Sequence, residues 1–125
     1  MLKQGVLVAG ILALTTCYAT PVTSKDITVG EKVFKKCVSC HSLNKNKIGP
    51  SLENLFGRTA GTREGYRYSR AMKESEVVWD EETLKKFLEK PRKFIKGNKM
   101  RFSGIRKESK LDALIAYLKE ATKIE

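Results

Sequence analysis

Five consecutive residues, Cys37-Val38-Ser39-Cys40-His41, have the types and spacing of a chemically active site. Two thiols three positions apart, followed directly by an imidazole, are typical of the covalent attachment of a c-type haem. The thiols form thioether bonds to the two vinyl groups of one porphyrin, and the next residue projects towards the iron as its proximal ligand. The motif therefore predicts one haem bound through Cys37 and Cys40, with His41 as an iron ligand.

Three other interpretations of the motif explain less. A structural zinc site needs about four Cys or His ligands, but the chain has one His and three Cys, and Cys17 lies in the expected leader described below. A thioredoxin-like redox pair should follow a strand in a βαβ context, whereas the residues before Cys37 have helical periodicity. A structural disulfide between Cys37 and Cys40 would leave His41 without a role.

Met100 is the candidate for the second axial position on the iron. Met1 belongs to the expected leader and Met72 to an expected helix, whereas Met100 lies in a loop between Gly97 and Gly104. A thioether ligand raises the reduction potential and closes the iron to small molecules, while an open position favours oxygen chemistry. The alternatives are Met100 as core filler, or an enzyme, a haem peroxidase or gas sensor, in which Met100 is displaced. The weak far-red band of a bond between Met sulfur and Fe(III) would separate the carrier from the enzyme.

The N-terminal residues resemble an export signal. Lys3 is followed by an apolar run and then by small residues ending at Ala19, which is the pattern of a secretory signal peptide. We therefore expect a signal peptide at 1–19, a flexible lead-in at 20–27 and one haem-binding domain at 28–125. An uncleaved anchor that tethers the protein to a membrane is the alternative, although the apolar run is shorter than the roughly 20 residues of a membrane span.

The chain is strongly basic, with a formal net charge of +11. Removal of the leader takes away only the charge of Lys3 and leaves +10. Basic chains often bind nucleic acid, but an exported protein does not normally meet it, so we expect no nucleic-acid partner. Acidic protein faces and peripheral contact with an anionic membrane are the partners that this charge favours.

The hydrophobic periodicity predicts an all-α fold of four to five helices with long loops. The expected elements are a helix capped by Thr28 that runs into the haem motif, a short helix at 69–74, a helix from Asp80 to Lys90, a turn at 92–95 and a final helix capped by Ser109. Loops of such length are uncommon in a small domain without something to pack them, and a haem would do so.

These residues together resemble the class I c-type cytochromes, in the branch of mitochondrial-type cytochrome c and its soluble bacterial relatives. Beside the haem motif, the resemblance rests on Gly30-Glu-Lys-Val-Phe34, Ile48-Gly-Pro-Ser-Leu52, Leu55-Phe-Gly-Arg58, Tyr66-Arg-Tyr68, Trp79, Leu84, Pro91-Arg-Lys-Phe-Ile95, Lys99-Met100-Arg-Phe-Ser-Gly-Ile105 and Leu114-Ile-Ala-Tyr-Leu118.

The resemblance implies a role for each site residue. His41 and Met100 would ligate the iron, and the Pro50 carbonyl would accept a hydrogen bond from the His41 ring. Gly30 and Phe34 would pack against the last helix. The residues expected beside the haem propionates are Arg58, Tyr68, Trp79 and Asn98.

The same resemblance implies a function. The chain would be a monomeric periplasmic one-electron carrier and not an enzyme, with a cytochrome bc complex as donor and a terminal oxidase as acceptor. Four residues depart from the family's usual pattern, namely Phe87 for Tyr, Met72 for Asn, Asn98 for Thr and Lys96 for Pro. They predict a less hydrogen-bonded environment around Met100 and a more mobile loop.

Overall fold

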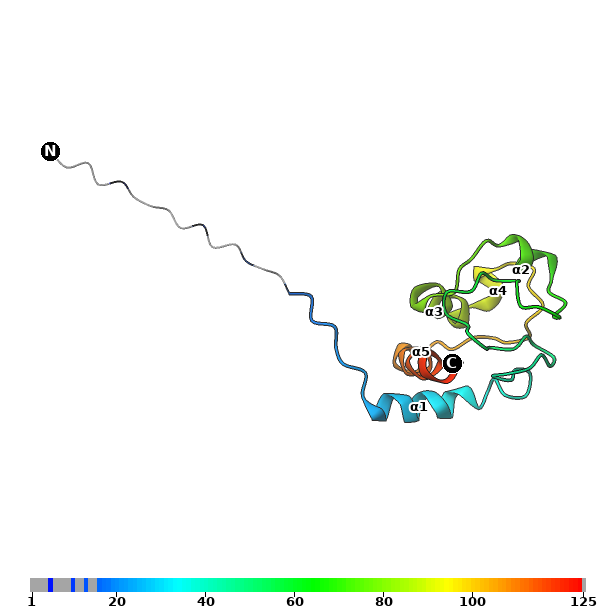
Figure 1. The fold of residues 1–125 in the computed structure, drawn as a ribbon, viewed down its shortest axis with the longest axis horizontal. Coiled ribbons are helices and arrows are strands. Elements are labelled where there is room, and N and C mark those ends of the chain that lie inside the picture. The colour runs from blue at the N-terminus through cyan, green and yellow to red at the C-terminus, as the bar shows by residue number, and fades with distance from the viewer. Residues whose placement is uncertain (1–4, 6–9, 11–12, 14–15, 125) are drawn as a thin grey trace.

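The computed structural model describes residues 5, 10, 13 and 16–124, and contains five helices in that part of the chain (Figure 1). They are α1 (Ser24–Phe34), α2 (Arg70–Glu74), α3 (Glu81–Glu89), α4 (Pro91–Phe94) and α5 (Glu108–Ala121). The one pairing of strand type among the described residues is an isolated bridge between Thr59 and Val78. The predicted all-α class is confirmed.

Helix α1 begins earlier than its sequence pattern predicts. Its N-cap is Thr23, whose side chain accepts from the Asp26 backbone while the Asp26 carboxylate accepts from Thr23. The predicted cap at Thr28 is wrong, because Thr28 lies inside the helix and its hydroxyl donates to the Ser24 carbonyl at 3.1 Å. The hydroxyl-x-x-acid pattern occurs twice here, and the upstream copy forms the cap. Residues 24–27, predicted to belong to a flexible lead-in, are therefore the first turn of a helix.

Most of the predicted signal peptide lies outside the described residues. Residues 16–23 have no regular secondary structure and lead away from the helical body (Figure 1). Among the described residues, no helix has both the length and the apolar character needed to cross a membrane.

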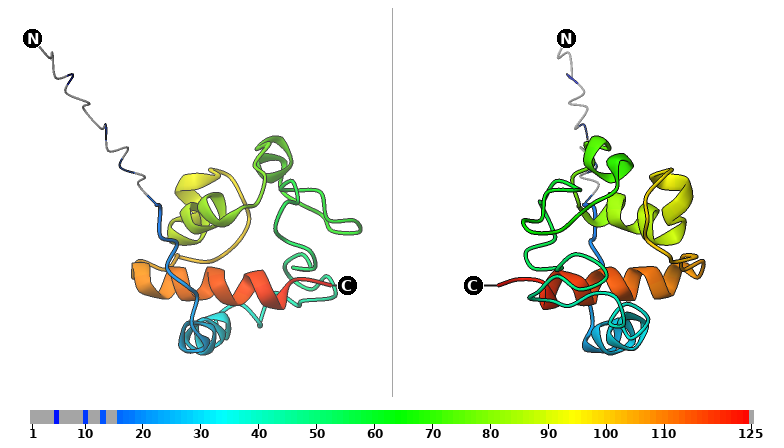
Figure 2. Two further views of the ribbon diagram at one scale, coloured as in Figure 1. Left: turned by 60° about the vertical axis from the view of Figure 1, so that its left-hand side comes forward. Right: turned by 90° about the vertical axis from the view of Figure 1, so that its right-hand side faces the viewer.

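Helix α5 lies between α1 and the α3–α4 pair, as both views in Figure 2 show. Its crossing with α1 is the most extensive helix contact, and Gly30 lies at the centre of it. A Cβ at Gly30 would lie 2.0 Å from the Ala113 carbonyl oxygen and 2.6 Å from Tyr117 Cβ. The rings of Phe34 and Tyr117 meet beside it, with centroids 5.2 Å apart. The predicted packing of the first helix on the last is thus present.

We expect Gly30→Ala to destabilise the protein by about 2 kcal/mol, because overpacking of a tight contact typically costs about 1–3 kcal/mol. The clash is with helix backbone, which cannot rotate away, so it outweighs the gain of about 1 kcal/mol in helix propensity. The midpoint of urea unfolding measures the effect. Glu31→Ala, at the exposed neighbouring position, is the control and should change stability little; equal midpoints for the two variants would contradict this account.

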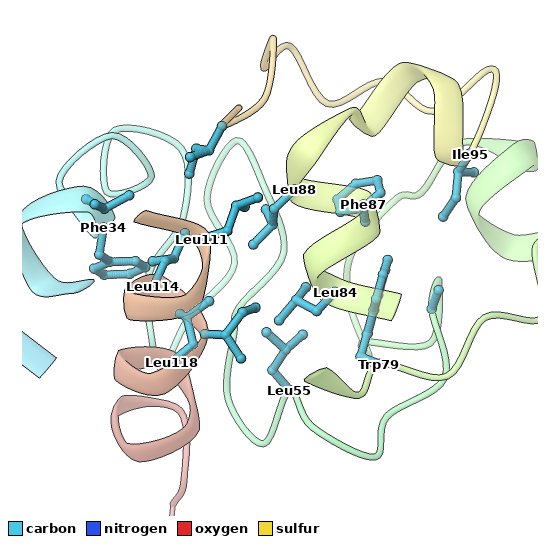
Figure 3. Close-up of a cluster of buried hydrophobic side chains, with 14 residues drawn as sticks. Phe34, Leu55, Trp79, Leu84, Phe87, Leu88, Ile95, Leu111, Leu114 and Leu118 are labelled. Atoms are coloured by element: carbon cyan, nitrogen blue, oxygen red, sulfur yellow. The ribbon is translucent and has the colours of Figure 1, made fainter. Parts of the chain in front are cut away.

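A single apolar core joins the helices (Figure 3). Leu111, Leu114 and Leu118 of α5 face Leu84 and Leu88 of α3. Trp79, just before α3, packs on Phe87 of that helix with ring centroids 5.0 Å apart. Burial of these side chains supplies most of the driving force for folding.

Helix α5 also begins at a different residue from the predicted one. Lys107 is its N-cap and makes no side-chain cap bond, so the predicted cap at Ser109 is wrong. Glu108 occupies the first turn instead, where a carboxylate interacts favourably with the helix dipole. The cap predicted for α3, Asp80, is confirmed, and Ser69 caps α2.

Candidate functional site

The Cys-x-x-Cys-His segment continues α1 as helix-like turns. The Cys37 N–H donates to the Phe34 carbonyl at 2.8 Å, and the His41 N–H donates to the Cys37 carbonyl at 2.8 Å. Cys37 and Cys40 are both unpaired and partly buried. This local geometry presents two free thiols and one imidazole from successive turns of a single rigid segment.

Gly49 and Pro50 hold the His41 ring. Nδ1 of His41 lies 2.8 Å from the Pro50 carbonyl oxygen, as the resemblance predicts. Because a carbonyl can only accept, Nδ1 carries the hydrogen and Nε2 keeps its lone pair for a metal ion. Gly49 is buried against the ring, and a Cβ there would lie 2.5 Å from Cε1 of His41. The loop therefore fixes both the tautomer and the position of the imidazole.

Burial sets the protonation of these groups. It lowers the pKa of His41, against the opposing effect of the Pro50 hydrogen bond, so the imidazole is neutral at pH 7, as a metal ligand must be. Burial, reinforced by the neighbouring Cys40, raises the pKa of the Cys37 thiol to about 11. Before it reacts, Cys37 is accordingly a neutral thiol rather than an exposed, reactive thiolate.

The loop that carries Met100 is fastened at both ends. On one side, the Met100 N–H donates to Oδ1 of Asn98 at 2.9 Å. On the other side, the Ile105 N–H donates to the Leu88 carbonyl of α3 at 2.9 Å. Met100 itself is partly buried and packs against the core. The loop that carries the Met100 thioether is thus hydrogen-bonded on both sides of this residue.

In this structure the side chain of Asn98, which is expected beside a propionate, bonds to the protein backbone. Its amide nitrogen donates to the Pro91 and Ile95 carbonyls at 2.9 and 2.8 Å, which uses both of its hydrogens at the end of α4. The amide oxygen of Asn98 accepts from the Met100 N–H. Asn98 therefore connects α4 to the backbone of Met100.

We expect Asn98→Ala to loosen this loop, because it removes three hydrogen bonds that each contribute about 1 kcal/mol. In the haem-loaded ferric protein, added imidazole should bind the iron faster than in wild type, and stopped-flow absorbance measures the rate. Asn44→Ala is the control, since Asn44 is exposed and its side-chain amide bonds only to Ser42. Equal rates for the two variants would show that Asn98 does not restrain Met100.

Three of the residues expected at the propionates, Arg58, Tyr68 and Trp79, lie near one another. Arg58 donates from Nη1 to the Glu53 carbonyl at 2.9 Å and from Nη2 to the Ser51 carbonyl at 3.0 Å, and burial lowers its pKa. Tyr68 accepts at its hydroxyl from the Arg63 N–H at 3.2 Å, and burial raises its pKa. Arg58 and Tyr68 thus share one polar cluster. The Trp79 N–H donates to the Arg58 carbonyl at 3.0 Å, while the Trp79 ring packs on Phe87 in the core.

Several supporting contacts are not visible in the sequence pattern. Arg63 forms an ion pair with Glu53, and its Nη2 lies 2.7 Å from Oε2. Lys99, beside Met100, donates to the Arg67 carbonyl, and its Nζ lies 5.4 Å from the centre of the Tyr66 ring. These residues come from loop segments that only the folded chain brings together. No periodicity or motif in the sequence therefore predicts their contacts.

In the part of the chain that the structure describes, no three His, Cys, Asp or Glu side chains are grouped so that they could hold an ion. Two free thiols, one imidazole with Nε2 available and one thioether in a fixed loop do fit the attachment and ligation of a c-type haem.

Comparison with known proteins agrees with this chemistry. The family model for cytochrome c matches residues 27–122. The chain belongs to the cytochrome c family. Proteins of this family carry electrons rather than catalyse a reaction, and they bind one covalent c-type haem. The fold is accordingly that of the class I cytochromes c, and Cys37 and Cys40 are the cysteines available for the thioether bonds.

Relatives from bacteria and eukaryotes resemble nearly the whole domain. Cytochrome c2 of Blastochloris viridis is 44% identical over 117 residues, covering 91% of each chain. Cytochrome c of Chlamydomonas reinhardtii is 50% identical over 101 residues, covering 78% of this chain and 90% of its own. The solved structure of cytochrome cH from Methylobacterium extorquens superposes with a TM-score of 0.73 at 44% identity and covers 75% of this chain and 97% of its own.

Proposed function

We propose that this cytochrome is a periplasmic one-electron carrier whose haem iron is ligated by His41 and Met100. The haem would supply the Fe(II)/Fe(III) couple, and with His41 and Met100 as its two protein ligands no substrate would need to reach the iron. Arg58, Tyr68, Trp79 and Asn98 would lie beside the propionates in this proposal. The leader at 1–19 accounts for export, after which haem attachment takes place outside the reducing cytosol.

One observation supports the proposed ligation most strongly. Both candidate ligands are positioned by specific contacts, because the Pro50 carbonyl accepts from the His41 ring and the Asn98 amide oxygen accepts from the Met100 backbone. Hydrogen bonds to the residues that ligate a metal orient those ligands and adjust the reduction potential of the metal. The same restraint lowers the reorganisation that accompanies a change of one electron.

The basic surface supports a docking role for acidic partners. Candidate contact residues are all exposed; they are Lys36, Lys45, Lys47, Lys93, Lys96, Lys99, Arg101 and Lys107. Lys90, Arg92, Lys93 and Arg101 also line an open hollow of about 550 Å³ beside Phe102. We propose acidic faces of a cytochrome bc complex and a cytochrome c oxidase as donor and acceptor, with the cytochrome acting as a monomer that can also contact an anionic membrane.

We expect electron transfer with an isolated cytochrome bc complex to slow by about tenfold or more between low and high salt. Charge complementarity raises association rates by 10-fold or more at low ionic strength, and salt screens it. Stopped-flow absorbance at the haem band gives the second-order rate at each salt concentration. Reduction by an uncharged small molecule is the control and should not respond to salt; a flat profile with the bc complex would rule out electrostatic docking.

Covalent attachment has a direct test in the exported protein. A haem stain after denaturing electrophoresis should mark the band of wild type and should be lost when Cys37 and Cys40 are both changed to Ser. A stained double variant would show that haem is held without thioether bonds, which would overturn the assignment of these two residues.

A further inference from the structure

Glu53 and Arg63 form a charged pair at the edge of the polar cluster that contains Arg58 and Tyr68. Nη2 of Arg63 lies 2.7 Å from Oε2 of Glu53, and the two side chains are only 28% and 26% exposed. In contrast, the chemically identical pair of Arg70 and Glu74 on α2, also at 2.7 Å, is 86% and 62% exposed. Water screens the first pair much less than the second.

Both members of the pair contact the residues expected at the propionates. The backbone carbonyl of Glu53 accepts from Nη1 of Arg58 at 2.9 Å. The backbone N–H of Arg63 donates to the Tyr68 hydroxyl at 3.2 Å. Glu53 and Arg63 therefore form the ion pair with their side chains and hold Arg58 and Tyr68 with their backbones.

The charges in this cluster influence one another. After burial, which has the largest effect, Glu53 raises and Arg63 lowers the pKa of Arg58. The cluster thus contains two guanidinium groups, those of Arg58 and Arg63, and one carboxylate, that of Glu53. Nε of Arg63 is buried and has no hydrogen-bond partner among the described residues.

We propose that the Glu53–Arg63 pair sets the reduction potential of the haem through its two fixed charges, acting next to Arg58 and Tyr68. This inference rests on the proposed function, in which those two residues hold the propionates. The iron site gains one positive charge on oxidation, so a nearby negative charge favours Fe(III) and a nearby positive charge favours Fe(II). Glu53 should lower the potential and Arg63 should raise it.

The test is a titration of the reduction potential in four variants of the haem-loaded full chain. We expect Glu53→Gln to shift the Fe(III)/Fe(II) equilibrium about threefold towards Fe(II), and Arg63→Gln about threefold towards Fe(III); at 59 mV per tenfold for one electron this is about 28 mV in opposite directions. The double variant should return close to wild type, and Arg63→Lys, which keeps the charge, should also stay close to it.

Other results would overturn the proposal. If the pair only held the fold together, both single variants would loosen the site, admit water and move the potential downwards together. A shift in Arg63→Lys as large as that in Arg63→Gln would point to geometry rather than charge. Arg70→Gln and Glu74→Gln are the matched controls, and shifts of the same size in them would show that any surface charge has this effect.

Failure of the proposed function would look different. The far-red band of the bond between Met sulfur and Fe(III) is recorded in the wild-type protein and in every variant. Its absence from wild type would contradict ligation by Met100, yet opposite shifts in Glu53→Gln and Arg63→Gln would still be measurable on the covalent haem. The two claims can therefore fail separately.

Discussion

Replacing Met100 by Ala in the haem-loaded protein should lower the reduction potential by on the order of 100 mV or more, since axial ligands set haem potentials over a range of about 0.8 V. The thioether stabilises Fe(II), and its loss leaves a position that water or added ligands can occupy. Redox titration measures the fall in potential. The far-red ferric band should disappear in the same variant, and cyanide should bind faster.

Met72→Ala is the matched control for this result. Met72 is also partly buried against the core, but it lies on α2 rather than in the restrained loop. Its removal should leave the far-red band intact, with at most a small change in potential. If Met72→Ala lost the band and Met100→Ala kept it, the assignment of the sixth ligand would have to be exchanged between the two residues.

Replacing Gly49 by Ala should disturb the other axial ligand and destabilise the haem-loaded protein by about 2–3 kcal/mol, a typical cost of overpacking. The added Cβ would lie 2.5 Å from Cε1 and 2.8 Å from both ring nitrogens of His41. The ring must tilt away, which weakens its bond to the Pro50 carbonyl. Guanidinium unfolding followed at the haem band measures the loss of stability.

Ile48→Ala is the control for the loop itself. Ile48 precedes Gly49 and its side chain is 75% exposed, so truncation there should change stability by less than about 0.5 kcal/mol, as surface substitutions usually do. If the two variants unfolded at the same denaturant concentration, contact with the His41 ring would not be the reason that Gly occupies position 49.

The sequence predicts those features that depend on local spacing. The haem motif, the order and faces of the helices and the cap at Asp80 all follow from patterns within a few residues. Where two local patterns compete, as at Thr23 and Thr28, only the folded cap shows which one forms. The residue at which a helix begins is therefore harder to predict from sequence than the presence of the helix.

The polar contacts across loops could not be predicted in this way. Asn98 could bond to a propionate or to the backbone, and only the position of the end of α4 directs its amide to the Pro91 and Ile95 carbonyls. The pairing of Glu53 with Arg63 likewise depends on how two irregular segments meet. Neither contact has a periodicity or a spacing that identifies it in advance.

The identity of the sixth ligand decides whether this cytochrome is a closed electron carrier. The most direct measurement is the far-red absorbance of the wild-type ferric protein at neutral pH. Ligation by Met100 predicts the weak charge-transfer band of a bond between Met sulfur and Fe(III), together with slow binding of cyanide. A spectrum without that band, with rapid cyanide binding, would show an open or water-ligated iron and would contradict the account.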